Sequence, residues 1–216
     1  PPTRIGVVDV KSAKTSWMNL EGDPSQHYLT KMEWSSKSEL IIQQLNRKQN
    51  VSKIWISNAS TGISRVLWIY SDQAWVDLEA TWNTNDNKGW NWIEGGKAFV
   101  WASEKDGWRH MYRIGMDGKE KLITSGNFDV IKIYLIDEAN NRLYFAASPD
   151  NATQRYLYAT KLDGTTAPER ITPDNFVGTN DYIFSPNSKW ARHSFTSHKY
   201  MPAIEWLNMP GHKPVD

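Results

Sequence analysis

The sequence of 216 residues contains no cysteine. This absence excludes disulfide frameworks, thiolate metal sites and cysteine nucleophiles. The sequence also lacks any run of about 18 consecutive apolar residues, the length that a transmembrane helix requires. Neither sign of charge dominates, because 25 Lys and Arg stand against 24 Asp and Glu. This balance argues against binding through phosphate neutralisation, and we expect no nucleic-acid partner.

Helical periodicity is also nearly absent. Short segments that alternate apolar and polar residues recur instead, and each is bounded by Gly, Asn, Asp, Ser or Pro. They are rich in β-branched and aromatic residues, which predicts strands. Predicted strands include Thr3–Val10, Leu40–Leu45, Ser52–Ser57, Ser64–Tyr70, Ala98–Ala102, His110–Ile114, Arg142–Ala147 and Ala203–Asn208.

An unusual feature of the composition is 12 Trp together with 9 Tyr. An aromatic content of this size argues against a disordered chain. The rings fall on alternating strand positions, which favours packing between small sheets. Stacking on sugars and capture of peptides are the alternatives.

A pair of strands recurs along the chain. Its copies span 33–42, 92–101, 136–145 and 184–192, and each has an apolar strand end, a tight polar turn and an apolar or aromatic second strand. A further strand with its turn follows each copy, at 54–62, 111–118, 157–164 and 204–211. Closing strands are predicted at 65–69, 120–124 and 169–172.

An interval of roughly 45 residues with four strands per unit is typical of a β-propeller blade. The sequence therefore predicts an all-β fold, a β-propeller segment of about four blades with four antiparallel strands each. The predicted blades cover 27–72, 90–126 and 130–173, and partial blades cover 1–22 and 180–211, the last with three strands. An insertion between blades is predicted at Trp75–Trp90. A β-sandwich is the alternative, but sandwiches do not repeat their loops at a constant interval.

The most distinctive segment is WASEKDGWRHMY at 101–112, followed by Asp117-Gly118, LITSG at 122–126 and Asp129-Val130. It resembles the S-E-x-D-G-(aromatic)-x-H-(apolar)-Y stretch in the propeller domain of dipeptidyl-peptidase-IV-like serine peptidases, in the prolyl oligopeptidase superfamily. Upstream, Trp34, Gln43 and 46–50 are similar to a strand pair of that family that ends in an N/R-R-x-Q-N turn. The resemblance extends from about His27 to Asn208.

The resemblance implies the N-terminal propeller of a serine exopeptidase whose catalytic triad lies in a separate C-terminal α/β-hydrolase domain. The sequence itself has no G-x-S-x-G nucleophile elbow, since 62–66 lacks the second Gly. The acidic pair with which the family binds the free amine of the substrate belongs to an earlier blade, and nothing here matches it. We therefore expect no enzymatic activity of this chain alone, and assign it no catalytic, substrate-anchoring, metal-binding or cofactor-binding residue.

The partners that the resemblance implies are the hydrolase domain and peptides that lose dipeptides or tripeptides from their N-termini. The propeller would exclude folded proteins and admit short peptides. In the family, inter-blade loops face the catalytic cavity, so Trp75–Trp90 is a candidate for contact with substrate. We expect a periplasmic or extracellular parent. The chain starts with Pro1; we expect an internal piece whose exposed blade faces self-associate or are covered by terminal segments.

The connection between two predicted strands contains Ser103, Glu104 and Asp106. Short acceptors there can bond free backbone N–H groups, and Gly107 permits a positive φ. Arg109 and His110 are candidates to pair with Glu104 or Asp106. We expect a network that organises the loop, with a ligand site as the alternative.

Other polar groups give weaker signals. His193 and His198 are spaced poorly for a shared metal, and neither His27, His110 nor His212 supplies a clear third ligand. Paired carboxylates could serve glycoside hydrolysis, but solvated loop charges explain Asp72, Asp77, Glu79 and Asp86. No continuous basic stripe is formed by Lys31, Lys37, Arg47, Lys48 and Lys53.

Three functions are carried forward. The leading hypothesis is the non-catalytic propeller of a dipeptidyl or tripeptidyl aminopeptidase, which gates the access of peptides to a hydrolase domain. The second is a stand-alone protein-interaction propeller, and the third is a Trp-rich carbohydrate-binding module.

Overall fold

The computed structural model describes residues 2–77 and 90–215. Within them the regular structure consists of five sheets and two short 3-10 turns, Glu94–Gly96 and Glu138–Asn140. The predicted all-β class is confirmed. The chain divides into two compact units: the first holds residues up to 77 with 90–99 and 114–119, and the second holds 100–113 and 120–215. None of the helical segments described has the length and apolar character needed to cross a bilayer.

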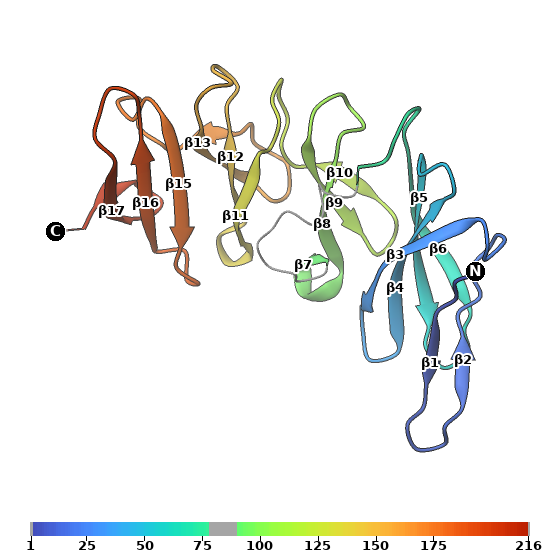
Figure 1. Ribbon diagram of the computed structural model, residues 1–216. Coiled ribbons are helices and arrows are strands. Elements are labelled where there is room, and N and C mark those ends of the chain that lie inside the picture. Colours follow the sequence, from blue (N-terminus) through green and yellow to red (C-terminus); the bar gives the residue numbers. More distant parts are fainter. Residues whose placement is uncertain (1, 78–89, 216) are drawn as a thin grey trace. The chain divides into compact units, whose positions relative to one another are not determined.

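The first unit begins with a hairpin of β1 (Gly6–Val8) and β2 (Thr15–Trp17). A four-stranded meander follows in the order β3-β4-β5-β6 (Figure 1). Its strands are β3 (His27–Trp34), β4 (Glu39–Asn46), β5 (Val51–Asn58) and β6 (Ser64–Ser71). Six consecutive residues of β4 are buried, because both faces of this strand are covered. One buried core cluster of this unit consists of Met18, Leu40, Ile42 and Trp55.

The next sheet is also a four-stranded meander and contributes residues to both units. Its strands are β7 (Asn91–Ile93), β8 (Ala98–Ser103), β9 (His110–Gly115) and β10 (Glu120–Leu122). Every residue of β8 is buried. Of the predicted insertion Trp75–Trp90, residues 78–89, which include Glu79 and Asp86, lie outside the described part of the chain.

The second unit contains two further meanders, drawn in yellow to red in Figure 1. One consists of β11 (Lys132–Asp137), β12 (Arg142–Ala147), β13 (Tyr156–Lys161) and β14 (Glu169–Arg170). The other consists of β15 (Thr179–Phe184), β16 (Trp190–Thr196), β17 (Ala203–Asn208) and β18 (Lys213–Pro214). A shared core joins the two, with Tyr144, Leu157 and Ala159 on one side and Tyr182, Ala191 and Leu207 on the other.

The last sheet corrects the prediction of a three-stranded partial blade at 180–211. Leu207 and Asn208 pair with Pro214 and Lys213, so β18 completes a fourth strand. A two-residue strand that contains proline leaves no alternating pattern in the sequence, and proline is tolerated because this strand lies at the sheet edge.

A recurrent glycine fixes how closely one sheet approaches the next. Gly62, Gly118 and Gly164 follow the third strand of their sheets and have φ of +74°, +80° and +62°. A Cβ atom on them would lie 2.1, 2.6 and 2.2 Å from backbone carbonyl oxygens of Trp17, Leu67 and Leu122. These carbonyls lie in or beside the last strand of the preceding sheet. The repeated glycine of the sequence is therefore needed both for its positive φ and for close contact between sheets.

Candidate functional site

The β8–β9 connection forms the polar network that the sequence predicts. His110 is 2% exposed, and its Nδ1 lies 2.8 Å from Asp106 Oδ2. Asp106 Oδ1 accepts a bond from the backbone N–H of Trp108. Although burial acts in the opposite direction, these hydrogen bonds lower the pKa of Asp106. Gly107, with φ +93°, completes the turn by donating to the carbonyl of Glu104. Of the predicted pairs, His110 with Asp106 forms.

The same segment is fastened to the β10–β11 connection. The backbone N–H of Arg109 donates to Asp129 Oδ1 at 2.7 Å, and the N–H of Val130 donates to the carbonyl of Arg109 at 2.7 Å. Two residues beyond Arg109, the N–H of Met111 donates to Thr124 Oγ1 at 2.9 Å. Thr124 and Asp129, two of the distinctive residues after the motif, thus act as acceptors that hold one connection against the next.

The following sheet repeats this arrangement and extends it. Thr172 Oγ1 accepts from the N–H of Leu157 at 2.8 Å, as Thr124 does for Met111. Thr172 Oγ1 also lies 2.8 Å from the hydroxyl of Tyr182. That hydroxyl in turn lies 2.8 Å from His212 Nε2. Burial raises the pKa of Tyr182 and lowers the pKa of His212.

Asn180 is the centre of a second chain of buried contacts. Its side-chain amide donates to the carbonyls of Arg155 and Phe176, at 2.9 and 3.1 Å. Its Oδ1 lies 2.8 Å from His193 Nε2, and His193 Nδ1 lies 2.8 Å from Glu205 Oε1. Asn180 and His193 are both fully buried. Burial lowers the pKa of His193, while the Glu205 carboxylate acts in the opposite direction.

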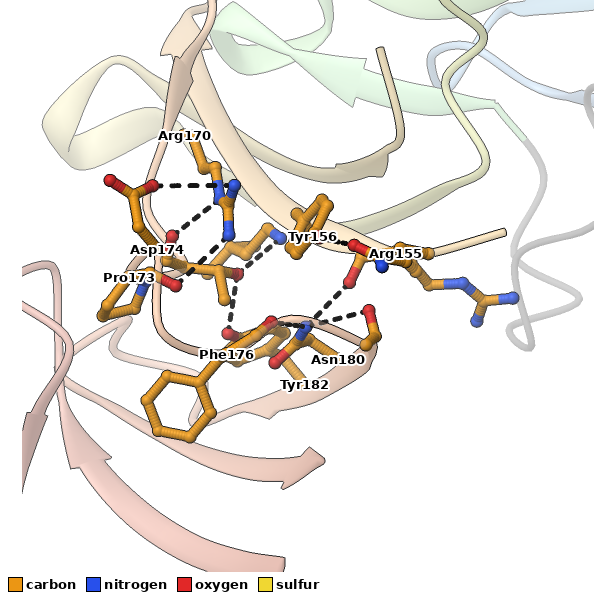
Figure 2. A network of polar contacts seen from close by, with 12 residues as sticks. Arg155, Tyr156, Arg170, Pro173, Asp174, Phe176, Asn180 and Tyr182 are labelled. Atoms are coloured by element: carbon orange, nitrogen blue, oxygen red, sulfur yellow. Dashed lines mark hydrogen bonds and ion pairs between the residues drawn. The ribbon is translucent and has the colours of Figure 1, made fainter. Parts of the chain in front are cut away.

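Arg170 closes the connection between β14 and β15 from the outside (Figure 2). Its guanidinium donates to the carbonyls of Thr172 and Pro173 and lies 3.7 Å from the ring centroid of Tyr156. Asp174 pairs with it at 3.6 Å. Arg170 therefore ties this connection together through two backbone carbonyls and the Asp174 carboxylate.

A cavity of about 400 Å³ lies in the second unit. Trp108 from the β8–β9 connection, residues 127–131 from the β10–β11 connection and residues 148–152 from the β12–β13 connection line it. The sequence could not indicate this cavity, because its walls come from three separate loops.

Two cavities in the first unit, of about 240 and 480 Å³, lie beside the segment that links β2 to β3. The acidic groups that line the smaller cavity have internal partners. Glu21 pairs with Lys53 at 3.3 Å, and Asp23 accepts from the backbone N–H of Ser25 at 2.9 Å.

Of the other histidines named in the sequence, His193 and His212 come together, with their ring centroids 5.1 Å apart. His193 is buried whereas His198 is exposed, and His27 bonds to Gln44. Asp72 caps a turn by accepting from the N–H of Ala74. In the described ranges, no group of three or more His, Asp or Glu side chains has the arrangement of metal ligands.

Comparison with known families gives a match over most of the chain. The family model described as "Dipeptidyl peptidase IV (DPP IV) N-terminal region" matches residues 1–202. The inactive dipeptidyl peptidase 10 of Mus musculus is 29% identical over 74% of this chain and 21% of its own length. The probable dipeptidyl-aminopeptidase B of Talaromyces marneffei is 22% identical over 99% of this chain and 24% of its own length. The chain thus spans 21–24% of the length of these two relatives.

Solved structures show the same fold. The dipeptidyl peptidase 4 of Porphyromonas gingivalis matches 98% of this chain and 28% of its own, with a TM-score of 0.79 and 24% identity. A putative dipeptidyl aminopeptidase IV from Bacteroides ovatus matches 98% of this chain and 31% of its own, with a TM-score of 0.74 and 18% identity. Together with the consecutive four-stranded meanders, these matches confirm the predicted β-propeller segment.

Proposed function

Because the chain belongs to the family of dipeptidyl peptidase IV N-terminal regions, we propose that it is the non-catalytic propeller portion of a serine-type dipeptidyl or tripeptidyl aminopeptidase. In this proposal it gates the access of peptides to a separate C-terminal α/β-hydrolase domain. The family match over residues 1–202 is the observation that carries the proposal. Peptide cleavage would be an activity of the parent protein. This chain matches 21–24% of the length of the two relatives described above, so it would form a minor part of that parent.

The rigidity of the loops supports a role in selection by size. Thr124, Thr172 and Asn180 each use a buried side-chain oxygen or amide to fix the backbone of a connection. A wall built of connections fixed in this way would exclude large substrates through steric clash, without contributing to the chemistry. The architecture therefore suits a gate more than a reaction centre.

A length series of peptides tests the gating function in the full-length parent. We expect kcat/KM to fall as an unstructured peptide with a fixed N-terminal tripeptide is extended, and to be negligible for the same sequence fused to a folded domain. A rate that is independent of length and of the fused domain would contradict gating. Because the N-terminal tripeptide is constant, the comparison isolates access from recognition.

A stand-alone binding role is the second candidate, and the name of one relative favours it. The name of the Mus musculus relative describes it as inactive, so proteins similar to this chain include one that is named as lacking activity. Labelling of the full-length parent with a fluorophosphonate probe separates the two candidates. A labelled serine supports the peptidase, and an unlabelled parent that still binds a protein partner supports the binding role.

A further inference from the structure

The cavity of the second unit has the chemistry of a binding site for a cation. We name it the acidic–aromatic cavity and define it by Trp108, Phe128, Asp129, Asp150 and Ile131. Its volume of about 400 Å³ is in the range of small-ligand sites. Two aromatic rings and two carboxylates meet around one space, a combination that attracts a positive charge carried on an apolar stem.

The two carboxylates are available to a ligand. Asp129 uses Oδ1 to accept the N–H of Arg109. In the residues that the structure describes, no Lys, Arg or His forms an ion pair with Asp129 or Asp150. The absence of a paired cation among the described residues distinguishes this cavity from the cavity of about 240 Å³ in the first unit, where Glu21 already pairs with Lys53.

The aromatic walls are held in place before any ligand arrives. Phe128 is 7% exposed. Its ring packs edge-on against His110, with 5.5 Å between ring centroids, and stacks on Phe145 and Tyr158, with centroid distances of 6.0 and 6.2 Å. Trp108 is 39% exposed, so its indole face is open to a ligand. Preorganised walls reduce the entropy that binding costs.

We propose that the acidic–aromatic cavity binds the basic side chain of a peptide, that of an arginine or a lysine. Its aliphatic stem would lie along Trp108 and Ile131, and its charged head would lie between Asp129 and Asp150. The assignment of a peptide as the carrier rests on the proposed function. The preference for a cation rests only on the lining of the cavity.

The probe pair is Nα-acetyl-L-arginine amide and Nα-acetyl-L-citrulline amide, which differ in side-chain charge at nearly the same shape and have no free α-amine. Binding to this chain is followed through the indole N–H resonance of Trp108 in ¹H–¹⁵N spectra, identified with a W108F variant. We expect a saturable shift with the arginine probe, binding at least about threefold weaker with citrulline, and weakening as salt rises.

Asp129→Asn and Asp150→Asn should each weaken binding of the arginine probe by about twofold to fivefold. Asp174→Asn is the matched control, since this substitution removes the same charge from a fully exposed side chain that does not line the cavity. Unchanged spectra elsewhere verify that each variant is folded. Equal binding of the two probes, no shift at Trp108, or an equal effect of the three substitutions would overturn the proposal. None of these results would bear on whether the parent is a peptidase, which is measured by its own turnover.

Discussion

The close approach of consecutive sheets at Gly164 allows a quantitative test of the fold. Gly164 has φ +62°, and a Cβ atom there would lie 2.2 Å from the carbonyl oxygen of Leu122. A left-handed backbone costs an L-residue about 1–2 kcal/mol. Forcing a methyl group against a backbone carbonyl adds about 1–3 kcal/mol. We therefore expect Gly164→Ala to lower the free energy of unfolding by about 2–5 kcal/mol.

Two glycines separate the conformational cost from the clash. Gly95 has nearly the same φ, +63°, and nothing lies within 4 Å of its Cβ position. Gly107, in the same unit as Gly164, has φ +93° and equally open space. Alanine at either control position should cost only the conformational part, about 1–2 kcal/mol.

Urea denaturation followed by circular dichroism measures all three variants, with midpoints converted to free energies through a common slope. We expect Gly164→Ala to be less stable than both control variants by more than about 1 kcal/mol. If the three substitutions cost the same, the sheets do not meet at this glycine and the described packing is wrong.

Three further predictions concern the second unit. Asn180→Ala leaves the carbonyls of Arg155 and Phe176 without their side-chain donor and should cost about 3–5 kcal/mol in urea denaturation; Asn127→Ala, at an exposed position, should cost less than about 0.5 kcal/mol. Burial, and after it the neighbouring His193, lowers the pKa of His212 from 6.5. The neutral His212 therefore stabilises the fold fully above pH 6.5, and this contribution is lost as the pH falls. The melting temperature should drop between pH 7 and 5, and should drop less in His212→Gln; equal drops in the two proteins would refute this role. Ile183, Ile204 and Trp206 are 59%, 62% and 59% exposed on one face of the last sheet; we expect light scattering to show a dimer that Ile204→Lys dissociates, and a monomeric mass of the unsubstituted chain would contradict this.

Periodic features of the fold could be predicted from the sequence. β12 and β17 have the bounds of the predicted strands Arg142–Ala147 and Ala203–Asn208. Turn residues mark their ends, with Asn140-Asn141 before β12 and Pro210-Gly211 after β17. The predicted strand Thr3–Val10 is shortened to Gly6–Val8, because the Asp9 carboxylate accepts the N–H groups of Lys11 and Ser12 and turns the chain there.

The buried polar chain could not be predicted in this way. Asn180, His193 and Glu205 come from three different strands, and their partners include backbone carbonyls that no sequence pattern specifies. The 101–112 segment gave a partial signal, since the pairing of His110 with Asp106 is local. The cavity depends on three loops that are distant in the sequence, and no local sequence pattern indicates that they meet.

The central proposal is that this propeller segment is separate from the catalytic site of its parent protein. Turnover of a dipeptidyl-proline chromogenic substrate, measured side by side for this chain and for the full-length parent, tests it directly. We expect the parent to turn over the substrate, and a serine-directed inhibitor to abolish this turnover. We expect no turnover by this chain at the same molar concentration. Inhibitor-sensitive turnover by this chain alone, or a full-length parent that cleaves no dipeptidyl substrate, would contradict it.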